Sequence, residues 1–199
     1  MNFEFLVATN NAHKLKEIRK ILSPFHITVY GMKDLNIDIG DVEENGKTYY
    51  ENALIKANAL KEVSKMPIIA DDSGLEIEAM GNIPGIYSSR YAESFGGYKQ
   101  TFEHIFKELK GKSRKARFVC NIVLVNVEDK PLRFEGIVPG RIAEEVTDDS
   151  PFGYDPIFIE DSLNKTYAAM DEDEKNKVSH RGVALTKLLT YLILNGRAY

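Results

Sequence analysis

The chain has 199 residues, 43% of them hydrophobic, so it can bury a substantial core and a globular protein is expected. Its net charge of −4 argues against a nucleic-acid-binding surface, but a nucleotide needs only a few local cations. The single cysteine fits a reducing compartment, the N-terminus does not read as a signal peptide, and no apolar run approaches the roughly eighteen residues of a membrane span. We therefore expect a cytoplasmic protein with neither membrane nor nucleic-acid partners.

The first 22 residues predict a strand, a polar loop and a helix. Phe3 to Ala8 is a short apolar run, and Leu15, Ile18 and Leu22 then repeat at helical spacing. The loop Thr9-Asn10-Asn11 lies between the two elements. A small polar loop that leads from a strand into a helix N-terminus is suited to holding an anion.

The next region predicts a second strand, an acidic segment, a helix and a buried strand. Residues 27–30 favour a strand, and residues 34–44 carry five acids and no base. Thr48 and Glu51 match the capping box of a helix that continues through Leu54, Ala57 and Leu60. The apolar run 67–70 indicates a buried strand that ends in Asp71-Asp72-Ser73-Gly74.

The second half of the chain mixes strands and helices. The pattern predicts a loop over 81–97, a helix over 102–109, a hairpin of strands 115–127 and 131–145, a loop over 151–156, a strand over 157–159 and a last helix from about 171 to 196. We expect an α/β or α+β fold.

One phosphate-binding motif can be rejected. Gly40 to Thr48 reads G-DVEEN-GKT, which is close to a P-loop, but five residues separate the glycines where four are required. The loop would also place Asp41, Glu43 and Glu44 against the phosphates, which would repel them. Thr48 has a simpler role as a helix cap.

These carboxylates suit a metal ion better. Mg²⁺ prefers oxygen ligands and commonly uses one or two carboxylates together with substrate phosphates. Asp71 and Asp72 follow a strand, where catalytic groups of open sheets gather, and neighbouring strand residues point to opposite faces. Only one of the two aspartates is therefore expected to face a given metal. A simple turn at Ser73-Gly74 is the alternative explanation.

Cations and an aromatic residue accompany these carboxylates in the sequence. Lys14 lies in the first turn of a predicted helix, and Asn52 and Lys56 share one helical face. Near the start of the last helix lie Lys175, Ser179, His180 and Arg181. The alternative to a binding role is that they form a charged, solvent-exposed helix start with a hydrogen-bonded histidine. Phe152 could stack on a planar base or simply pack in its loop.

Together these residues resemble the inosine/xanthosine triphosphate pyrophosphatase family over nearly the whole chain. Seven blocks occur in the family's order: residues 9–14, Glu43-Glu44, Glu51-Asn52-Ala53 with Lys56, residues 70–75, residues 84–91, residues 152–156, and Lys175 with Ser179-His180-Arg181. Asn10 departs from the pattern, since relatives often carry glycine there. Each block alone is weak, but seven in order are specific.

The resemblance implies an elongated mixed central sheet with flanking helices, in one catalytic domain over 1–199 whose two lobes surround a nucleotide cleft. It implies a homodimer and a purine nucleoside triphosphate substrate. Mg²⁺ would lie near Glu43 and Asp72, with Asp72 as the base that activates water. The substrate-binding residues implied are Thr9, Asn10, Asn11, Ala12, His13, Lys14, Lys56, Ser73, Phe152, Gly153, Tyr154, Asp155, Lys175, His180 and Arg181.

The resulting hypothesis is hydrolysis of ITP, XTP or dITP to the monophosphate and pyrophosphate, which would cleanse the nucleotide pool. Lys175 or Arg181 could meet the oxygen at purine position six. Two alternatives stay open: a Maf-like nucleotide pyrophosphatase, and a nucleotide-binding sensor without catalysis. The base is not decided between Asp71 and Asp72, nor the metal ligand between Glu43 and Glu44.

Overall fold

The computed structural model describes residues 3–147 and 152–197; Pro151 of the predicted 151–156 loop lies outside them. Within these ranges, eight strands form one sheet in the order β2-β1-β3-β5-β6-β7-β8, with β4 paired to β3. The strands are β1 (Phe3–Val7), β2 (Ile27–Gly31), β3 (Ile68–Ile77), β4 (Ile83–Pro84), β5 (Lys115–Val125), β6 (Leu132–Ile142), β7 (Phe158–Glu160) and β8 (Lys165–Thr166).

The helices are α1 (Ala12–Leu22), α2 (Tyr49–Lys61), α3 (Ser88–Ser94), α4 (Tyr98–Glu108), α5 (Glu172–Val178) and α6 (His180–Leu194). β1 runs parallel to β2 and β3, whereas β7 is antiparallel to β6 and β8. The expected α/β class, with a mixed central sheet flanked by helices, is confirmed.

The chain divides into two compact units. Unit 1 comprises residues 1–72, 120–136 and 181–199, and unit 2 comprises residues 73–119 and 137–180. The boundary falls within β3, between Asp72 and Ser73, and again between His180 and Arg181.

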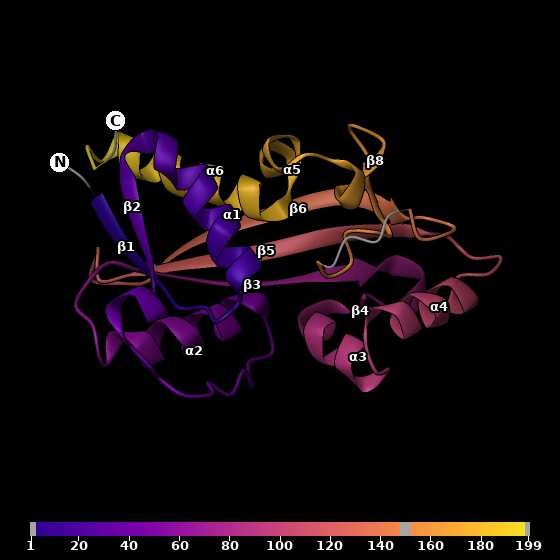
Figure 1. Cartoon of the computed structure of the whole chain (residues 1–199), viewed down its shortest axis with the longest axis horizontal. Coiled ribbons are helices and arrows are strands. Elements are labelled where there is room, and N and C mark those ends of the chain that lie inside the picture. Colours follow the sequence, from indigo (N-terminus) through magenta and orange to yellow (C-terminus); the bar gives the residue numbers. More distant parts are fainter. Residues whose placement is uncertain (1–2, 148–151, 198–199) are drawn as a thin grey trace. The chain divides into compact units, whose positions relative to one another are not determined.

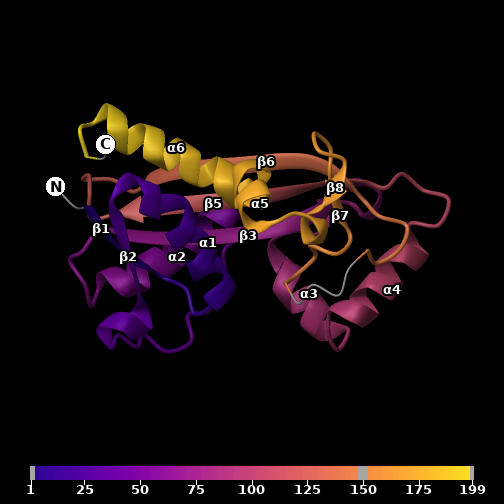
Figure 2. The same cartoon turned by 45° about the horizontal axis from the view of Figure 1, so that its top comes forward.

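Unit 1 is a three-layer sandwich. Alternate strand residues such as Val7 and Ile69 pack with Ile18 of α1 and Leu185 of α6. The residues between them pack with Ala53, Ala57 and Leu60 of α2. Figures 1 and 2 show α1 and α6 on one face of the sheet and α2 on the other. Strand alternation therefore decides which helix each β3 side chain meets.

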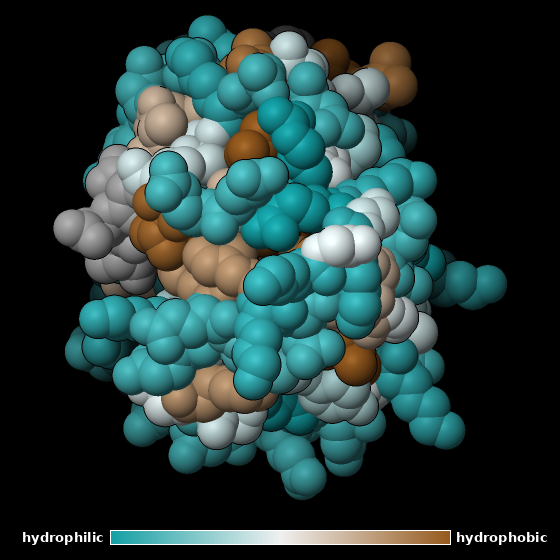
Figure 3. Space-filling model, turned by 90° about the vertical axis from the view of Figure 1, so that its right-hand side faces the viewer, coloured by the Kyte–Doolittle hydropathy of each residue, from teal (hydrophilic) through white to brown (hydrophobic). Residues whose placement is uncertain are grey.

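Unit 2 has an aromatic interior. The Phe118 ring contacts Phe158 edge-on at 4.7 Å between centroids and stacks on Tyr167 at 5.6 Å. In the view of Figure 3, from the side that carries α3 and α4, the surface is mostly hydrophilic with scattered hydrophobic residues. Isolated apolar residues of this kind are normal on soluble surfaces.

Two predictions of local structure were wrong. The predicted loop 81–97 contains β4 and the short helix α3. The predicted last helix is two helices, because Ser179 adopts an extended backbone (φ −76°, ψ 155°) that ends α5 before α6 begins. Among the described residues, no helix is both long and apolar enough to cross a membrane.

The predicted capping box begins α2. Thr48 Oγ1 accepts the Glu51 N–H at 3.1 Å, and Glu51 Oε2 accepts the Thr48 N–H at 3.1 Å. These reciprocal bonds satisfy amides that have no partner within the helix. The cap thus fixes the start of the helix that carries Asn52 and Lys56.

We expect Thr48→Ala to lower the free energy of unfolding by about 1 kcal/mol, because it removes the acceptor for the Glu51 amide. Urea denaturation of the wild type and the variant measures this loss. Thr48→Ser keeps the hydroxyl and should stay close to the wild type. Equal losses in both variants would show that the hydroxyl does not stabilise the helix.

Candidate functional site

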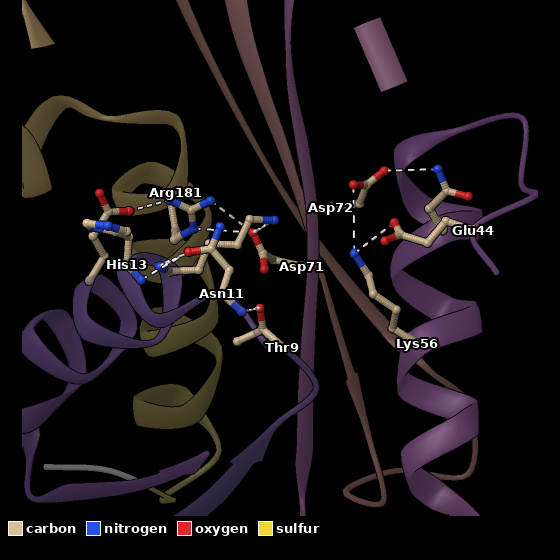
Figure 4. Close-up of polar contacts among 11 residues, drawn as sticks. Thr9, Asn11, His13, Glu44, Lys56, Asp71, Asp72 and Arg181 are labelled. Carbon is tan, nitrogen blue, oxygen red and sulfur yellow. Dashed lines mark hydrogen bonds and ion pairs between the residues drawn. The ribbon is translucent and has the colours of Figure 1, made fainter. Parts of the chain in front are cut away.

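The centre of the candidate site is the aspartate pair at the end of the unit 1 part of β3. Ile69 packs on the α1 and α6 side of the sheet, and Ala70 packs on the α2 side. Asp71 and Asp72 continue this alternation. In Figure 4 the labelled Asp71 points towards Arg181 and Asp72 points towards Lys56, on opposite sides of the strand. The prediction that the two carboxylates face different surroundings is confirmed.

Asp71 is buried and ion-paired through one of its oxygens on the α1 and α6 side. Its Oδ2 accepts from Lys14 Nζ at 3.1 Å and from Arg181 Nε and NH2 at 3.2 and 3.0 Å. Arg181 NH1 also binds Glu17 of α1. Burial alone would raise the pKa of Asp71, but Lys14 and Arg181 outweigh it and hold the pKa well below its ordinary value. Asp71 is therefore a carboxylate that stays ionised.

Asp72 has a different environment on the α2 side. Asn52 Nδ2 donates to Asp72 Oδ2 at 3.1 Å, and Lys56 Nζ lies 3.8 Å from Asp72 Oδ1. The same ammonium donates to Glu44 Oε2 at 2.9 Å. Burial raises the pKa of Asp72, although Lys56 opposes the shift. A carboxylate with a raised pKa is the better proton acceptor of the two.

The balance of charge differs between the two sides of β3. On the α1 and α6 side, the paired carboxylates of Asp71 and Glu17 meet the two cations of Lys14 and Arg181. On the α2 side, the carboxylates of Asp72 and Glu44 meet one cation, Lys56. Among the described contacts, the α2 side therefore carries one surplus negative charge, shared by the buried Asp72 and the half-buried Glu44.

A divalent cation fits this surplus. Two carboxylates are a usual protein contribution to a Mg²⁺ site, with substrate phosphates and water completing the shell. In the part of the chain that the structure describes, no cluster of three or more His, Cys, Asp or Glu side chains could hold a metal without such help. The structure places Glu44 rather than the predicted Glu43 beside Lys56, and the Glu43 residue is exposed. The assignment of Glu43 stays a prediction.

The predicted anion loop starts α1. Asn11 Oδ1 accepts the N–H groups of His13 and Lys14 at 3.0 and 3.1 Å, and Thr9 Oγ1 accepts the Asn11 N–H at 3.1 Å. Thr9 is half-buried, and the next four residues at this helix end are exposed, namely Asn10, Asn11, Ala12 and His13. The loop thus holds a helix N-terminus, which favours anions, beside the Lys14 ammonium.

Three residues of the predicted purine set meet in unit 2. Lys175 Nζ donates to Asp155 Oδ2 at 2.6 Å and lies 4.8 Å from the centroid of the half-buried Phe152 ring. It also lies 5.6 Å from the Tyr167 ring. A cation, a carboxylate and an aromatic ring therefore lie together in unit 2.

The remaining unit 2 residues of the set are Ser73, Gly153, Tyr154 and His180. His180 stacks on Phe118 with centroids 4.4 Å apart and an interplanar angle of 9°. The buried Tyr154 donates from its hydroxyl to the Ser88 carbonyl at 2.8 Å. Gly153 has a φ of 60°, which favours glycine in this loop, and Ser73 is half-buried. Tyr154 thus anchors the 152–156 loop.

The sequence analysis placed Asn52 on the helical face of Lys56 without giving it a role, and it did not single out Glu17. The buried Asn52 joins Asp72 to the loop before α2, because its Oδ1 accepts the Gly46 N–H at 2.9 Å. A Cβ at Gly46 would lie 2.7 Å from that Oδ1, so the close approach requires glycine. The four-residue spacing from Lys56 was the available signal for Asn52. No sequence signal marked Glu17.

The lowered pKa of Asp71 makes its contribution to stability pH-dependent. A folded-state pKa below the unfolded value of about 3.9 adds stability that is present above that pH and is lost as the pH falls towards the folded pKa. We expect Asp71→Asn to cost about 3–5 kcal/mol near neutral pH, and less below about pH 4, because it leaves buried cations unpaired. Urea unfolding across this range measures the difference. A pH-independent difference would contradict the assignment.

Comparison with known proteins identifies relatives along nearly the full length. A family model described as "Ham1 family" matches residues 5–191. The chain is 43% identical over 194 residues to a protein named dITP/XTP pyrophosphatase from Clostridium perfringens, covering 93% of this chain and 95% of that one. A protein of the same name from Bacillus subtilis is 43% identical over 189 residues, covering 93% and 94%.

Solved structures of similar proteins have the same fold as this chain. A HAM1 protein from Coxiella burnetii superposes with a TM-score of 0.82 at 36% identity, covering 96% of this chain and 98% of that chain. The Staphylococcus aureus Ham1 protein gives a TM-score of 0.81 at 36% identity, covering 96% and 99%. These findings confirm the resemblance that the seven sequence blocks indicated. The chain belongs to the Ham1 family.

Proposed function

We propose that this protein hydrolyses non-standard purine nucleoside triphosphates, such as XTP, ITP and dITP, to the monophosphate and pyrophosphate. Relatives that carry the name dITP/XTP pyrophosphatase support the substrate class. The observation that carries the proposal is the division of charge across β3. On one side of the strand, two carboxylates pair with two cations, one of which is Lys14. On the other side, two carboxylates lie beside the single ammonium of Lys56 in the described contacts.

In this proposal Asp72 and Glu44 would hold Mg²⁺, together with substrate phosphate oxygens. When bound, the metal supplies polarisation of the phosphate and a lowered pKa for water. Asp72, fixed by Asn52, accepts the proton of the attacking water. Lys14 and Lys56 stabilise the negative charge that grows on the pyrophosphate leaving group.

The purine is assigned to the unit 2 residues around Lys175. Inosine and xanthosine carry an oxygen at position six, which accepts from the Lys175 ammonium, whereas adenine presents an amino donor there. A buried donor that faces another donor can cost a factor of about 10⁴ in specificity. Stacking on Phe152 is available to any planar base. We further propose, from the resemblance alone, that the enzyme is a cytoplasmic homodimer.

The phosphate product released from the triphosphate distinguishes the proposed hydrolysis from a phosphatase and from a nucleotide-binding sensor. With Mg²⁺ present, XTP and ITP should yield pyrophosphate, and ATP should be the poorest purine substrate. Release of orthophosphate instead would indicate a phosphatase. Binding without any hydrolysis would indicate the sensor.

Asp72→Asn should lower kcat by about 10³-fold or more with the fold intact, because the variant cannot accept the proton of water. Circular dichroism checks the fold, and pyrophosphate release from XTP checks the rate. A variant that keeps wild-type turnover would remove Asp72 from the mechanism.

Lys56→Gln should tighten the binding of Mn²⁺ to the nucleotide-free protein by about tenfold, since the Lys56 ammonium opposes a second cation near Asp72 and Glu44. Electron paramagnetic resonance of free Mn²⁺ measures the affinity without any turnover. Lys14→Gln is the matched control, because Lys14 pairs with Asp71 across the strand and its removal should change Mn²⁺ binding much less. Weaker Mn²⁺ binding in Lys56→Gln would argue against a metal on this side.

A further inference from the structure

A hydrogen-bonded junction in unit 2 joins three segments that are far apart in the sequence. Its centre is Ser88, a buried residue at the start of α3. The Ser88 Oγ accepts the Leu75 N–H of β3 at 2.9 Å, and the Ser88 carbonyl accepts the Tyr154 hydroxyl at 2.8 Å. Ser88 therefore connects β3 and α3 with the loop 152–156, and all of these residues belong to unit 2.

The hydroxyl of Ser88 continues the backbone pairing of β3. The strand β4 pairs only with the last two residues of β3, and the Leu75 amide just before them uses Ser88 Oγ as its acceptor. The same hydroxyl donates to the Gly85 carbonyl at 2.7 Å. A Cβ at Gly74 would lie 2.1 Å from that carbonyl oxygen, so the 85–88 turn packs directly on the β3 backbone. Because a buried amide is costly to leave without an acceptor, these bonds hold Ser88 against β3.

The side chain of Tyr154 is packed into this junction. Tyr154 is 3% exposed, and its ring meets Tyr98 of α4 edge-on, with centroids 5.2 Å apart and an interplanar angle of 88°. The Phe102 ring of the same helix lies 6.1 Å away. The resemblance placed Tyr154 with the substrate-binding residues, whereas its ring packs on α4 and its hydroxyl is bound by Ser88. The side chain therefore has almost no surface to offer a base.

The residues on either side of Tyr154 have a different partner. Phe152 and Asp155 both contact Lys175 of α5. The loop between them is a tight turn, because the Asp155 N–H donates to the Phe152 carbonyl at 3.3 Å and Gly153 has a φ of 60°. A displacement of Tyr154 therefore moves Phe152 and Asp155 together.

We propose that Ser88 and Tyr154 are positioning residues for base recognition, which set the preference among purines although their side chains do not contact the nucleotide. The hydrogen bond between them fixes the loop that carries Phe152 and Asp155. This inference rests on the proposed function in taking those two residues as the ones that meet the purine. Because the junction contains no charged group, it acts on the base and leaves the binding of phosphate unchanged.

A positioning role and a merely structural role differ in their effect on the preference among bases. A partly unfolded enzyme loses kcat/KM for every triphosphate by the same factor. A displaced base loop loses more kcat/KM for a base that it recognises than for one that it rejects. The ratio of kcat/KM for ITP to kcat/KM for ATP is therefore the readout. Binding of pyrophosphate with Mg²⁺, measured by isothermal titration calorimetry on the full chain, is the control for the phosphate subsite.

Tyr154→Phe keeps the ring on α4 and removes only the hydroxyl that the Ser88 carbonyl accepts. We expect the ITP-to-ATP ratio to fall by about three- to tenfold, the factor that one hydrogen bond is worth, with unchanged affinity for pyrophosphate. Tyr98→Phe is the matched control, because it alters the same aromatic cluster and keeps the bond from Tyr154 to Ser88. Its ratio should stay at the wild-type value. An unchanged ratio in Tyr154→Phe, or an equal fall in Tyr98→Phe, would overturn the proposal.

Ser88→Ala tests the other end of the junction. It keeps the backbone carbonyl that Tyr154 binds, but it leaves the Leu75 amide without its acceptor and releases the turn from β3. The ITP-to-ATP ratio should fall here as well, and a folded Ser88→Ala protein with the wild-type ratio would overturn the proposal. A wild-type protein that releases no pyrophosphate from ITP would instead refute the proposed function.

Discussion

The alternation of side chains along β3 is the constraint on which the site depends. Two adjacent aspartates in an extended strand must point to opposite faces, and here each face is covered by different helices. Asp71 meets the cations of α1 and α6, and Asp72 meets Asn52 and Lys56 of α2. Two carboxylates of the same chemistry thereby acquire different partners and opposite pKa shifts.

The surrounding elements hold each aspartate in its own environment. Asn52 fixes Asp72 from a helix whose start is set by the Thr48 capping box. Arg181 fixes Asp71, and its position at the beginning of α6 follows from the break at Ser179. That break also separates neighbouring residues of one sequence block, since His180 stacks on Phe118 in unit 2 while Arg181 belongs to unit 1.

Local patterns in the sequence predicted much of this arrangement. The capping box at Thr48, the Asn11 loop before α1 and the opposite directions of Asp71 and Asp72 depend on residues close in the chain, and the structure bears them out. The partners of Arg181 could not be predicted, because Glu17 and Asp71 are distant in sequence and meet only through packing. The helix α3 was missed because glycines and Pro84 favoured a loop over 81–97.

The most direct test of the account is the position of a metal relative to β3. A crystal of the protein with Mn²⁺ and pyrophosphate should show one anomalous peak on the α2 side, contacting Asp72 and Glu44, with Asp71 still bound to Lys14 and Arg181. Asp71 Oδ1 is buried and has no hydrogen-bond partner among the described residues, so it is the alternative ligand for the metal. A peak on Asp71, with Asp72 still bound only by Asn52 and Lys56, would contradict the division of roles.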